Sequence, residues 1–296
     1  MGLIEIGVQN LFCKYEIIMI KVAPLRYGVI FKKAFCHPEI FTAFVEDFVG
    51  IRLEIDHVET EKSFDPPVGK VNSRFDLFAE DKKNRVIVDI QHAQYKEHYD
   101  RFLHYHCSAI LEQVANSKSY RHNLQVYTLV ILTSGDYHQS DIAVIDFDPK
   151  TLDGKPLGEI AHKIIYICPP YVSDNTPEPL REWMLAIKDT QDEEVDETIY
   201  NKSEILKIFD YIRQDLISVE DRTKMIDEYN ENDLRQDLFD KGITKGEISM
   251  LRHLLEKRFK SLPDWVDDRL NQADSVQLKE YLDKALDGDS LEEVFE

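Results

Sequence analysis

Two aspartates stand in strand-like segments at positions where an apolar side chain would be usual. Asp76 lies in RFDLFA and Asp89 lies in RVIVDIQ, with a short charged stretch between the two segments. A carboxylate buried in a hydrophobic strand is costly unless a partner compensates its charge. Two facing carboxylates also repel each other, so a cation between them would stabilise both. The pair therefore indicates a site for a divalent metal ion such as Mg²⁺.

The spacing of these segments predicts that the two aspartates oppose each other. A hairpin whose turn is centred between Lys82 and Lys83 pairs Asp76 with Asp89. Directly opposed Cβ atoms lie roughly 4.5–5.5 Å apart, which lets both carboxylates share one ion. Since side chains alternate along a strand, Gln91 shares the face of Asp89.

Two other interpretations stay open for this hairpin. Lys-Lys is not the Asn-Gly type of pair that two-residue hairpins prefer, so a longer loop over residues 81–84 also fits, and a bulge would shift the pairing by one residue. An aspartate in a strand is also often an exposed edge residue without a chemical role. Two aspartates in register, followed by Gln91, favour the metal site.

Composition and charge limit the class of protein. The 296 residues are enough for one large or two ordinary domains. No apolar run approaches the roughly 18 residues that span a bilayer, and residues 1–23 carry charges within their apolar stretch, unlike a secretory signal. We therefore expect a cytoplasmic protein without membrane contact. Four widely spaced cysteines without a CxxC pair give no support for a zinc site.

The net charge of −20 argues at first against a nucleic-acid partner. Residues 1–135 are nevertheless close to neutral, with 16 basic and 17 acidic side chains, whereas the remaining residues hold 20 basic and 39 acidic ones. The half that carries the paired aspartates could thus present a basic face. The candidates for this face are Lys32, Lys33, Lys70, Arg74, Lys82, Lys83 and Arg85.

The elements that must position the aspartates predict an α/β fold. A hairpin followed by a long crossover helix and further strands is typical of an αβ sandwich with a mixed sheet. We expect helices over residues 26–35, 38–49 and 95–117, a strand over 51–60, the hairpin over 73–91, and strands over 124–133, 141–147 and 159–168.

The chain divides into four expected parts. They are an N-terminal extension at 1–23, an αβ domain at 24–170, an acidic, proline-containing connector at 171–202 and a helical C-terminal region at 203–296. Residues 1–18 could derive from an upstream start codon. In the last part, Gly242 and Gly246 are expected to break the helical pattern. The apolar stripe formed by Leu251, Leu254, Leu255 and Phe259 predicts a bundle core, with self-association into a homo-oligomer as the alternative.

The long expected helix carries further polar residues. Arg101 and Tyr105 are four residues apart and share one helix face. Arg101 could bind a phosphate oxygen, steady Asp89, or form a surface ion pair with Glu97. Four histidines in this region fall on several helix faces, which is not the pattern of a histidine metal site. They are His92, His98, His104 and His106.

The order of these motifs matches a known family. The stretches that carry the match are IFKKAF (30–35), PEIFTAFVEDFVGI (38–51), RFDLFAEDKKNRVIVDIQ (74–91), YDRFLHY (99–105), SY (119–120), VYTLVIL (126–132) and the helical C-terminal sequence. Together they resemble the recombination-promoting nuclease, or transposase, family of the PD-(D/E)XK nuclease superfamily, over about residues 24–296. The resemblance implies a restriction-endonuclease-like αβ sandwich for the domain at 24–170.

The resemblance also implies a metal-dependent DNA endonuclease that acts in transposition or recombination. Asp76 matches the first acidic ligand, Asp89 the second, and Gln91 the superfamily lysine. The backbone carbonyl of Ile90 would be a further ligand of Mg²⁺, or of Mn²⁺ in its place. Such an ion activates water and neutralises phosphate charge. The Gln91 amide would orient the attacking water, and Arg101 would stabilise the developing phosphate charge.

Two positions depart from the family pattern. The family has an acidic residue in the first helix where this chain has Gly28, and Glu46 on the second helix is a candidate substitute ligand. Asp89 stands where glutamate is more usual. Beside an active DNA endonuclease, two alternatives therefore stay open. One is a catalytically inactive member that binds nucleic acid or protein, and the other is an enzyme that acts on RNA.

Overall fold

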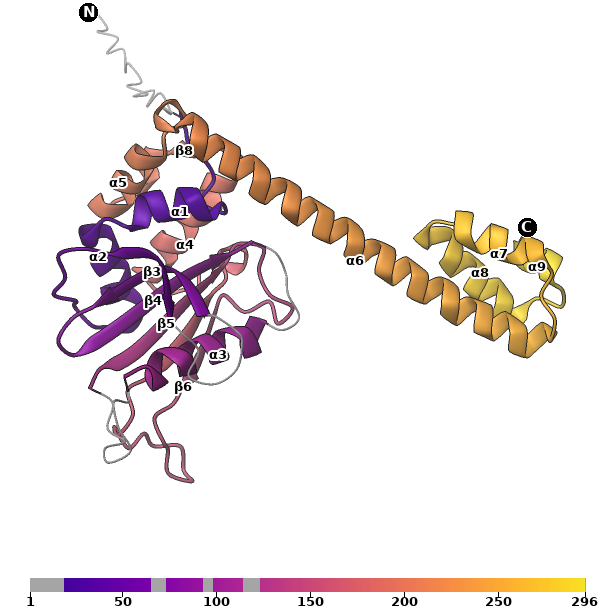
Figure 1. Ribbon diagram of the computed structural model, residues 1–296, viewed down its shortest axis with the longest axis horizontal. Coiled ribbons are helices and arrows are strands. Elements are labelled where there is room, and N and C mark those ends of the chain that lie inside the picture. Colours follow the sequence, from indigo (N-terminus) through magenta and orange to yellow (C-terminus); the bar gives the residue numbers. More distant parts are fainter. Residues whose placement is uncertain (1–18, 65–72, 93–97, 114–122, 296) are drawn as a thin grey trace, which may run out of the picture. The chain divides into compact units, whose positions relative to one another are not determined.

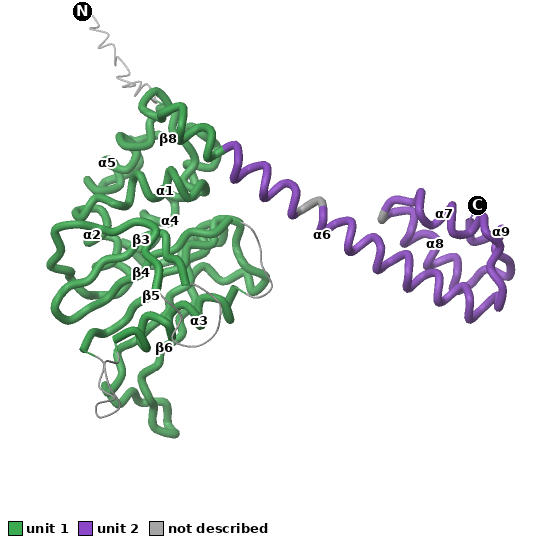
Figure 2. Tube along the Cα trace, viewed as in Figure 1, with its two compact units in different colours: residues 1–225 green, residues 226–296 purple. Residues whose placement is uncertain are grey.

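The computed structural model describes residues 19–64, 73–92, 98–113 and 123–295 (Figure 1). The chain forms two compact units, residues 1–225 and residues 226–296 (Figure 2). The expected start-codon extension at 1–18, the proline-containing loop after Phe64 and the Ser119-Tyr120 motif lie outside the described residues, as does Glu97.

A six-stranded mixed sheet organises the first unit, with strand order β2-β3-β4-β5-β7-β6. The β4-β5 and β5-β7 pairs are parallel, and the other three pairs are antiparallel. This arrangement confirms the expected αβ fold with a mixed sheet. The strands are β2 (Glu59–Phe64), β3 (Ser73–Glu80), β4 (Asn84–Gln91), β5 (Gln125–Leu132), β6 (Ile142–Asp146) and β7 (Lys163–Ile167).

Helices cover both faces of this sheet (Figure 1). On one face, Leu77, Val88 and Leu129 belong to one apolar cluster with side chains of four helices. On the other face, Phe102 and Ala109 of a single helix, α3, pack against the strands. The four helices are α1 (Gly28–Phe35), α2 (Pro38–Val49), α4 (Leu180–Asp189) and α5 (Ser203–Ile212), and α3 is His98–Leu111.

Helix α2 has the bounds that the sequence predicts, for identifiable reasons. Pro38 occupies the first helical position, where its missing N–H is no loss. Gly50 follows the last turn with a φ of 80°, a left-handed conformation that glycine adopts without strain. The helix therefore carries its start and stop signals in its own sequence.

The predicted strand over residues 51–60 is wrong. The strand of this region is β2, which begins at Glu59 and pairs with β3 from Ser73 to Phe78. Leu53 is buried, and Ile51 and Ile55 pack against the same apolar core without belonging to a strand. The alternating apolar pattern thus reflects side-chain burial, while the hydrogen-bonding partner strand determines where β2 lies.

The first unit also includes the whole of the expected connector, residues 171–202. Trp183, Met184 and Ile187 of α4 are buried in the core that contains α1 and α2. Strand β8 (Glu194–Asp196) pairs with β1 (Met19–Lys21) in a small second sheet. The connector is therefore paired with the first described strand of the chain. Short 3₁₀ helices lie at Pro169–Tyr171, Thr190–Asp192, Glu197–Ile199 and Gln214–Leu216.

Helix α6 (Val219–Phe259) continues through Gly242 and Gly246, contrary to the predicted break. Neither glycine has a positive φ, and a glycine inside a helix costs only about 1 kcal/mol relative to alanine. One or two such residues therefore do not end a helix whose other positions favour it. No helix among the described residues is both long enough and apolar enough to cross a bilayer.

The second unit has a helical core of its own. Leu251 and Leu255 are buried, and Leu254 and Phe259 pack against the same cluster, which confirms the predicted bundle core. Asp274 caps the helix α8 (Ser275–Asp287) through a capping box with Gln277. The partners of α6 in this core are α7 (Asp264–Gln272), α8 (Ser275–Asp287) and α9 (Leu291–Phe295).

A buried histidine gives the first unit a specific pH dependence. His106 on α3 is fully buried, stacks on Phe147 and shares a hydrogen bond of 2.9 Å with Thr128 Oγ1. Burial, together with the nearby His162, lowers the pKa of His106 to about 3. In the unfolded chain its pKa is roughly 6.5. Below that pH the unfolded state binds a proton that the folded state excludes.

We therefore expect the free energy of unfolding to lose about 1.4 kcal/mol per pH unit through His106 as the pH falls from about 6.5 toward 3. His106→Gln should remove this component and flatten the profile by about one proton. Urea titrations at several pH values, monitored by Trp183 fluorescence in a Trp265→Phe background, measure it. Parallel profiles for both proteins would contradict the assignment.

Candidate functional site

The β3–β4 hairpin has the predicted register. Leu77 pairs with Val88, and the pairing continues to the turn, so Asp76 and Asp89 occupy opposed positions. The last pair is Glu80 with Arg85, so residues 81–84 lie between the paired positions, with the Asp81 N–H donating to the Asn84 carbonyl at 2.9 Å. The constant register excludes a bulge between Leu77 and Arg85.

The side chain of Asp81 stabilises this Lys-Lys turn. Its Oδ1 accepts hydrogen bonds from the backbone N–H groups of Lys83 at 2.8 Å and Asn84 at 2.7 Å. An aspartate that bonds to the backbone two residues later is a standard turn stabiliser. The turn therefore forms without the Asn-Gly pair that such hairpins usually prefer.

Carboxylates connect the two strands at the level of the aspartates. The Asp76 N–H donates to Asp89 Oδ1 at 3.3 Å, and the Ile90 N–H donates to Asp76 Oδ2 at 3.1 Å. Each aspartate thus accepts a hydrogen bond from the backbone of the opposite strand. These contacts hold both carboxylates between the strands and close to each other.

The environment opposes ionisation of this pair. Asp89 is only 4% exposed, and burial, with the charge of Asp76, raises the pKa of Asp89 well above its ordinary value. Burial also raises the pKa of Asp76, although the Lys32 charge acts against this. Asp89 Oδ2 is buried and has no hydrogen-bond partner in the described part of the chain. An orphaned carboxyl oxygen of this kind is what a bound cation would satisfy.

These donors fit a divalent metal ion. Mg²⁺ and Mn²⁺ prefer carboxylate and carbonyl oxygens, and Asp76 and Asp89 supply them. Within the described ranges, however, no group of three or more His, Cys, Asp or Glu side chains could hold an ion as it stands. The pair therefore needs further ligands, from the chain, from water or from a substrate.

Lys32 and Glu61 complete the surroundings of Asp76. Lys32 Nζ lies 3.5 Å from Asp76 Oδ1 and also forms an ion pair with Glu61. Arg74 forms a second ion pair with Glu61. Burial raises the pKa of Glu61, but the hydrogen bond and charge of Lys32 and the charge of Arg74 outweigh it, so the pKa lies below its usual value.

The sequence pattern does not indicate Glu61 as a neighbour of Asp76, and it indicates Lys32 only as a candidate for a basic face. Glu61 lies between the pairs Thr60–Leu77 and Lys62–Phe75, and so stands opposite Asp76. Only the β2–β3 register places Glu61 opposite Asp76. A strand expected at residues 51–60 does not give that register.

The other predicted site residues lie on the elements expected for them. Gln91 is buried at the end of β4, and its backbone carbonyl accepts a hydrogen bond of 3.0 Å from the Thr133 N–H. Glu46 is exposed on α2, and no hydrogen bond or ion pair among the described residues links it to Asp76 or Asp89. The roles of Gln91, Glu46 and the Ile90 carbonyl stay predictions.

Arg101 lies on α3 with its guanidinium 5.3 Å from the ring centres of Phe102 and Tyr105. Its Nε also donates to the Tyr105 hydroxyl at 3.3 Å. Its positive charge lowers the pKa of Asp89 against the dominant effects of burial and Asp76. The catalytic role of Arg101 stays a prediction.

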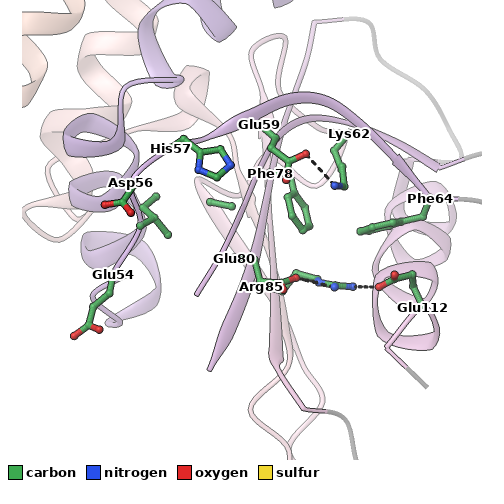
Figure 3. A pocket seen from close by; sticks show the side chains of 12 residues that line it. Glu54, Asp56, His57, Glu59, Lys62, Phe64, Phe78, Glu80, Arg85 and Glu112 are labelled. Carbon is green, nitrogen blue, oxygen red and sulfur yellow. Dashed lines mark hydrogen bonds and ion pairs between the residues drawn. The ribbon is translucent and has the colours of Figure 1, made fainter. Parts of the chain in front are cut away.

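A separate pocket lies elsewhere on the sheet (Figure 3). One of its lining residues, Arg85, is buried and bridges Glu80 and Glu112 at 2.7 Å each. Arg85 thus ties the hairpin to the end of α3 and does not contribute to a basic surface. None of the predicted site residues lines this pocket. The lining residues are Glu54, Ile55, Asp56, His57, Glu59, Lys62, Phe64, Phe78, Ala79, Glu80, Arg85 and Glu112.

Comparison with known proteins identifies the class to which this fold and site belong. A family model described as PD-(D/E)XK nuclease family transposase matches residues 29–238. The match covers more than half of the chain, so this protein belongs to that family. A search of curated proteins and a search of solved structures found no significant match. The resemblance seen in the motif order is thereby confirmed, and it indicates a nuclease-related role.

The buried pair should lower the stability of the protein in the absence of a cation. Asp89→Asn removes one of two like charges while keeping the side-chain shape and the acceptor for the Asp76 N–H. We expect the variant to be more stable by roughly 1–2 kcal/mol in urea unfolding at neutral pH with a chelator present. Glu46→Gln, an exposed change on α2, is the control and should leave the midpoint unchanged. A less stable Asp89→Asn protein would refute this account.

Proposed function

We propose that this protein is a DNA endonuclease that uses Mg²⁺, or Mn²⁺ in its place, in transposition or recombination. The observation that carries the proposal is the opposed pair Asp76 and Asp89, with its orphaned carboxylate oxygen, at the predicted register of a hairpin in a nuclease-family fold. Family membership supports the reaction class, and the carboxylate pair supports the metal dependence.

The side chains around the pair suit phosphodiester hydrolysis. Asp76, Asp89 and the Ile90 carbonyl would hold the ion, which when bound supplies an activated water and neutralises phosphate charge. Gln91 cannot act as a base, but its amide can orient the attacking water. Arg101 offers guanidinium donors to the phosphate as negative charge develops on it.

The positive charges near the pair suit a phosphate backbone. Lys32 and Arg74 each form an ion pair with Glu61, which stands opposite Asp76. Arg101 is within electrostatic reach of Asp89. These cations are local to the site, so a net charge of −20 for the whole chain does not exclude a polyanionic substrate. Binding carried by such contacts should weaken steeply as the salt concentration rises.

The first test is cleavage of supercoiled plasmid DNA. With Mg²⁺ or Mn²⁺ the protein should produce nicked circles, and EDTA should abolish the reaction. Asp76→Asn should reduce the rate by on the order of 10² or more, because it removes a carboxylate ligand. Asp153→Asn, an exposed aspartate change in a distant loop, is the matched control and should retain full activity.

The other outcomes of this test distinguish the alternatives. Salt-dependent DNA binding without cleavage, by protein that also binds no metal in calorimetry, would establish the non-catalytic binding module instead. Faster cleavage of RNA than of DNA under the same conditions would reassign the substrate while leaving the site intact.

Arg101 provides a test of the electrostatic role. Arg101→Met should lower kcat by on the order of 10², with a smaller change in KM, if the guanidinium acts on charge that develops in the transition state. Arg52→Met, a change at an exposed arginine, controls for the lost surface charge. Equal kcat values for the two variants would show that Arg101 is only a surface residue.

A further inference from the structure

Lys32 interacts with a carboxylate from outside the hairpin, Glu61 of β2, as well as with the hairpin aspartates. The Lys32 ammonium contacts Asp76 at 3.5 Å and pairs with Glu61, and its charge also acts on Asp89. Two carboxylates, from β2 and β3, therefore contact one ammonium group, and the carboxylate from β4 lies within its electrostatic reach. A cation at the centre of several carboxylates is the charge arrangement that a divalent ion requires.

The backbone of β2 is distorted at the residue that supplies the third carboxylate. Glu61 has a φ of 59°, a left-handed conformation that is unusual for a residue other than glycine, asparagine or aspartate, and more so inside a strand. Such strained conformations persist only where the surroundings impose them, and they cluster at functional sites.

The side-chain alternation of the neighbouring strand is interrupted at the same level. Phe75 and Phe78 both belong to one apolar cluster, although residues three apart should face opposite sides of a regular strand. Leu77, between them, belongs to the cluster on the other face. Asp76 is the residue at which the alternation changes, directly opposite Glu61. Both irregularities therefore occur where two acidic side chains meet.

Helix α1 supplies a cation, Lys32, to the surroundings of Asp76. Helix α1 begins at Gly28 and has no acidic residue in its first turn. Gly28 and Lys32 are four residues apart and so share a face of α1. Because Lys32 reaches Asp76 and Glu61, an acid at position 28 would project toward the same place.

We infer that Glu61 is the third carboxylate of the metal site, and that Lys32 neutralises this site until a divalent ion displaces its ammonium group. The inference rests on the proposed function. No covalent step is involved: the ion takes over Asp76 and Glu61 while Arg74 stays paired with Glu61. Glu61 should then strengthen metal binding, and Lys32 should compete with the ion.

The test is calorimetric titration with Mn²⁺ of the full chain and four variants. Glu61→Gln should weaken binding by about 10- to 100-fold, the range typical when support for a metal site is lost. Glu61→Asn should weaken binding equally. Because asparagine tolerates the left-handed backbone at this position, this variant controls for a loss of binding caused by misfolding. Lys32→Met should bind Mn²⁺ more tightly than the unmodified protein. Glu59→Gln, on the same strand and paired with Lys62, should leave binding unchanged.

A second-site rescue makes the assignment specific. Gly28→Asp in the Glu61→Gln background should restore most of the Mn²⁺ affinity, since it places a carboxylate on the face of α1 that carries Lys32. An acid in the first turn of a helix is also stabilised by the helix dipole. If the unmodified protein binds Mn²⁺ and Glu61→Gln binds it equally well, the inference fails while the proposed nuclease stands. If the unmodified protein binds no Mn²⁺, both fail.

Discussion

Repulsion between two opposed carboxylates is the constraint on which this structure depends. Asp76 and Asp89 are held together because the β3–β4 register places them at opposed positions. Each also accepts a backbone hydrogen bond from the opposite strand. Burial makes their charges costly. The elements around the hairpin compensate this charge: Lys32 comes from α1 and Arg101 from α3.

The compensating cations come from helices on opposite faces of the sheet. Helix α1 belongs to the large apolar cluster on one face, while α3 packs on the other, so cations can approach the hairpin from either side. The ammonium of Lys32 balances the carboxylates that a divalent ion would otherwise balance. Stability and function thus oppose each other here, since the arrangement that would bind an ion is unfavourable without one.

Much of the site could be predicted from local signals. The hairpin register follows from the number of residues between the aspartates, and Asp81 supplies the turn bonds that Lys-Lys lacks. The strand before the hairpin could not be predicted in the same way. Its apolar alternation at Ile51, Leu53 and Ile55 reports burial against helices, whereas its true position depends on hydrogen bonds to β3. The same limit applies to α6, where Gly242 and Gly246 signal a break that the helix does not make.

The sequence by itself determined the αβ fold, the opposed pair Asp76 and Asp89, and the family. The fold and the pair follow from spacing along short segments, because strand alternation and turn length are local properties. The family follows from the resemblance in motif order. Only the tertiary structure decided which charges surround the pair. Glu61 and Lys32 are distant from Asp76 in sequence, and they meet there because the β2–β3 register and the packing of α1 on the sheet bring them together. Side-chain contacts between separate elements are set by such packing, and no pattern within one segment encodes them.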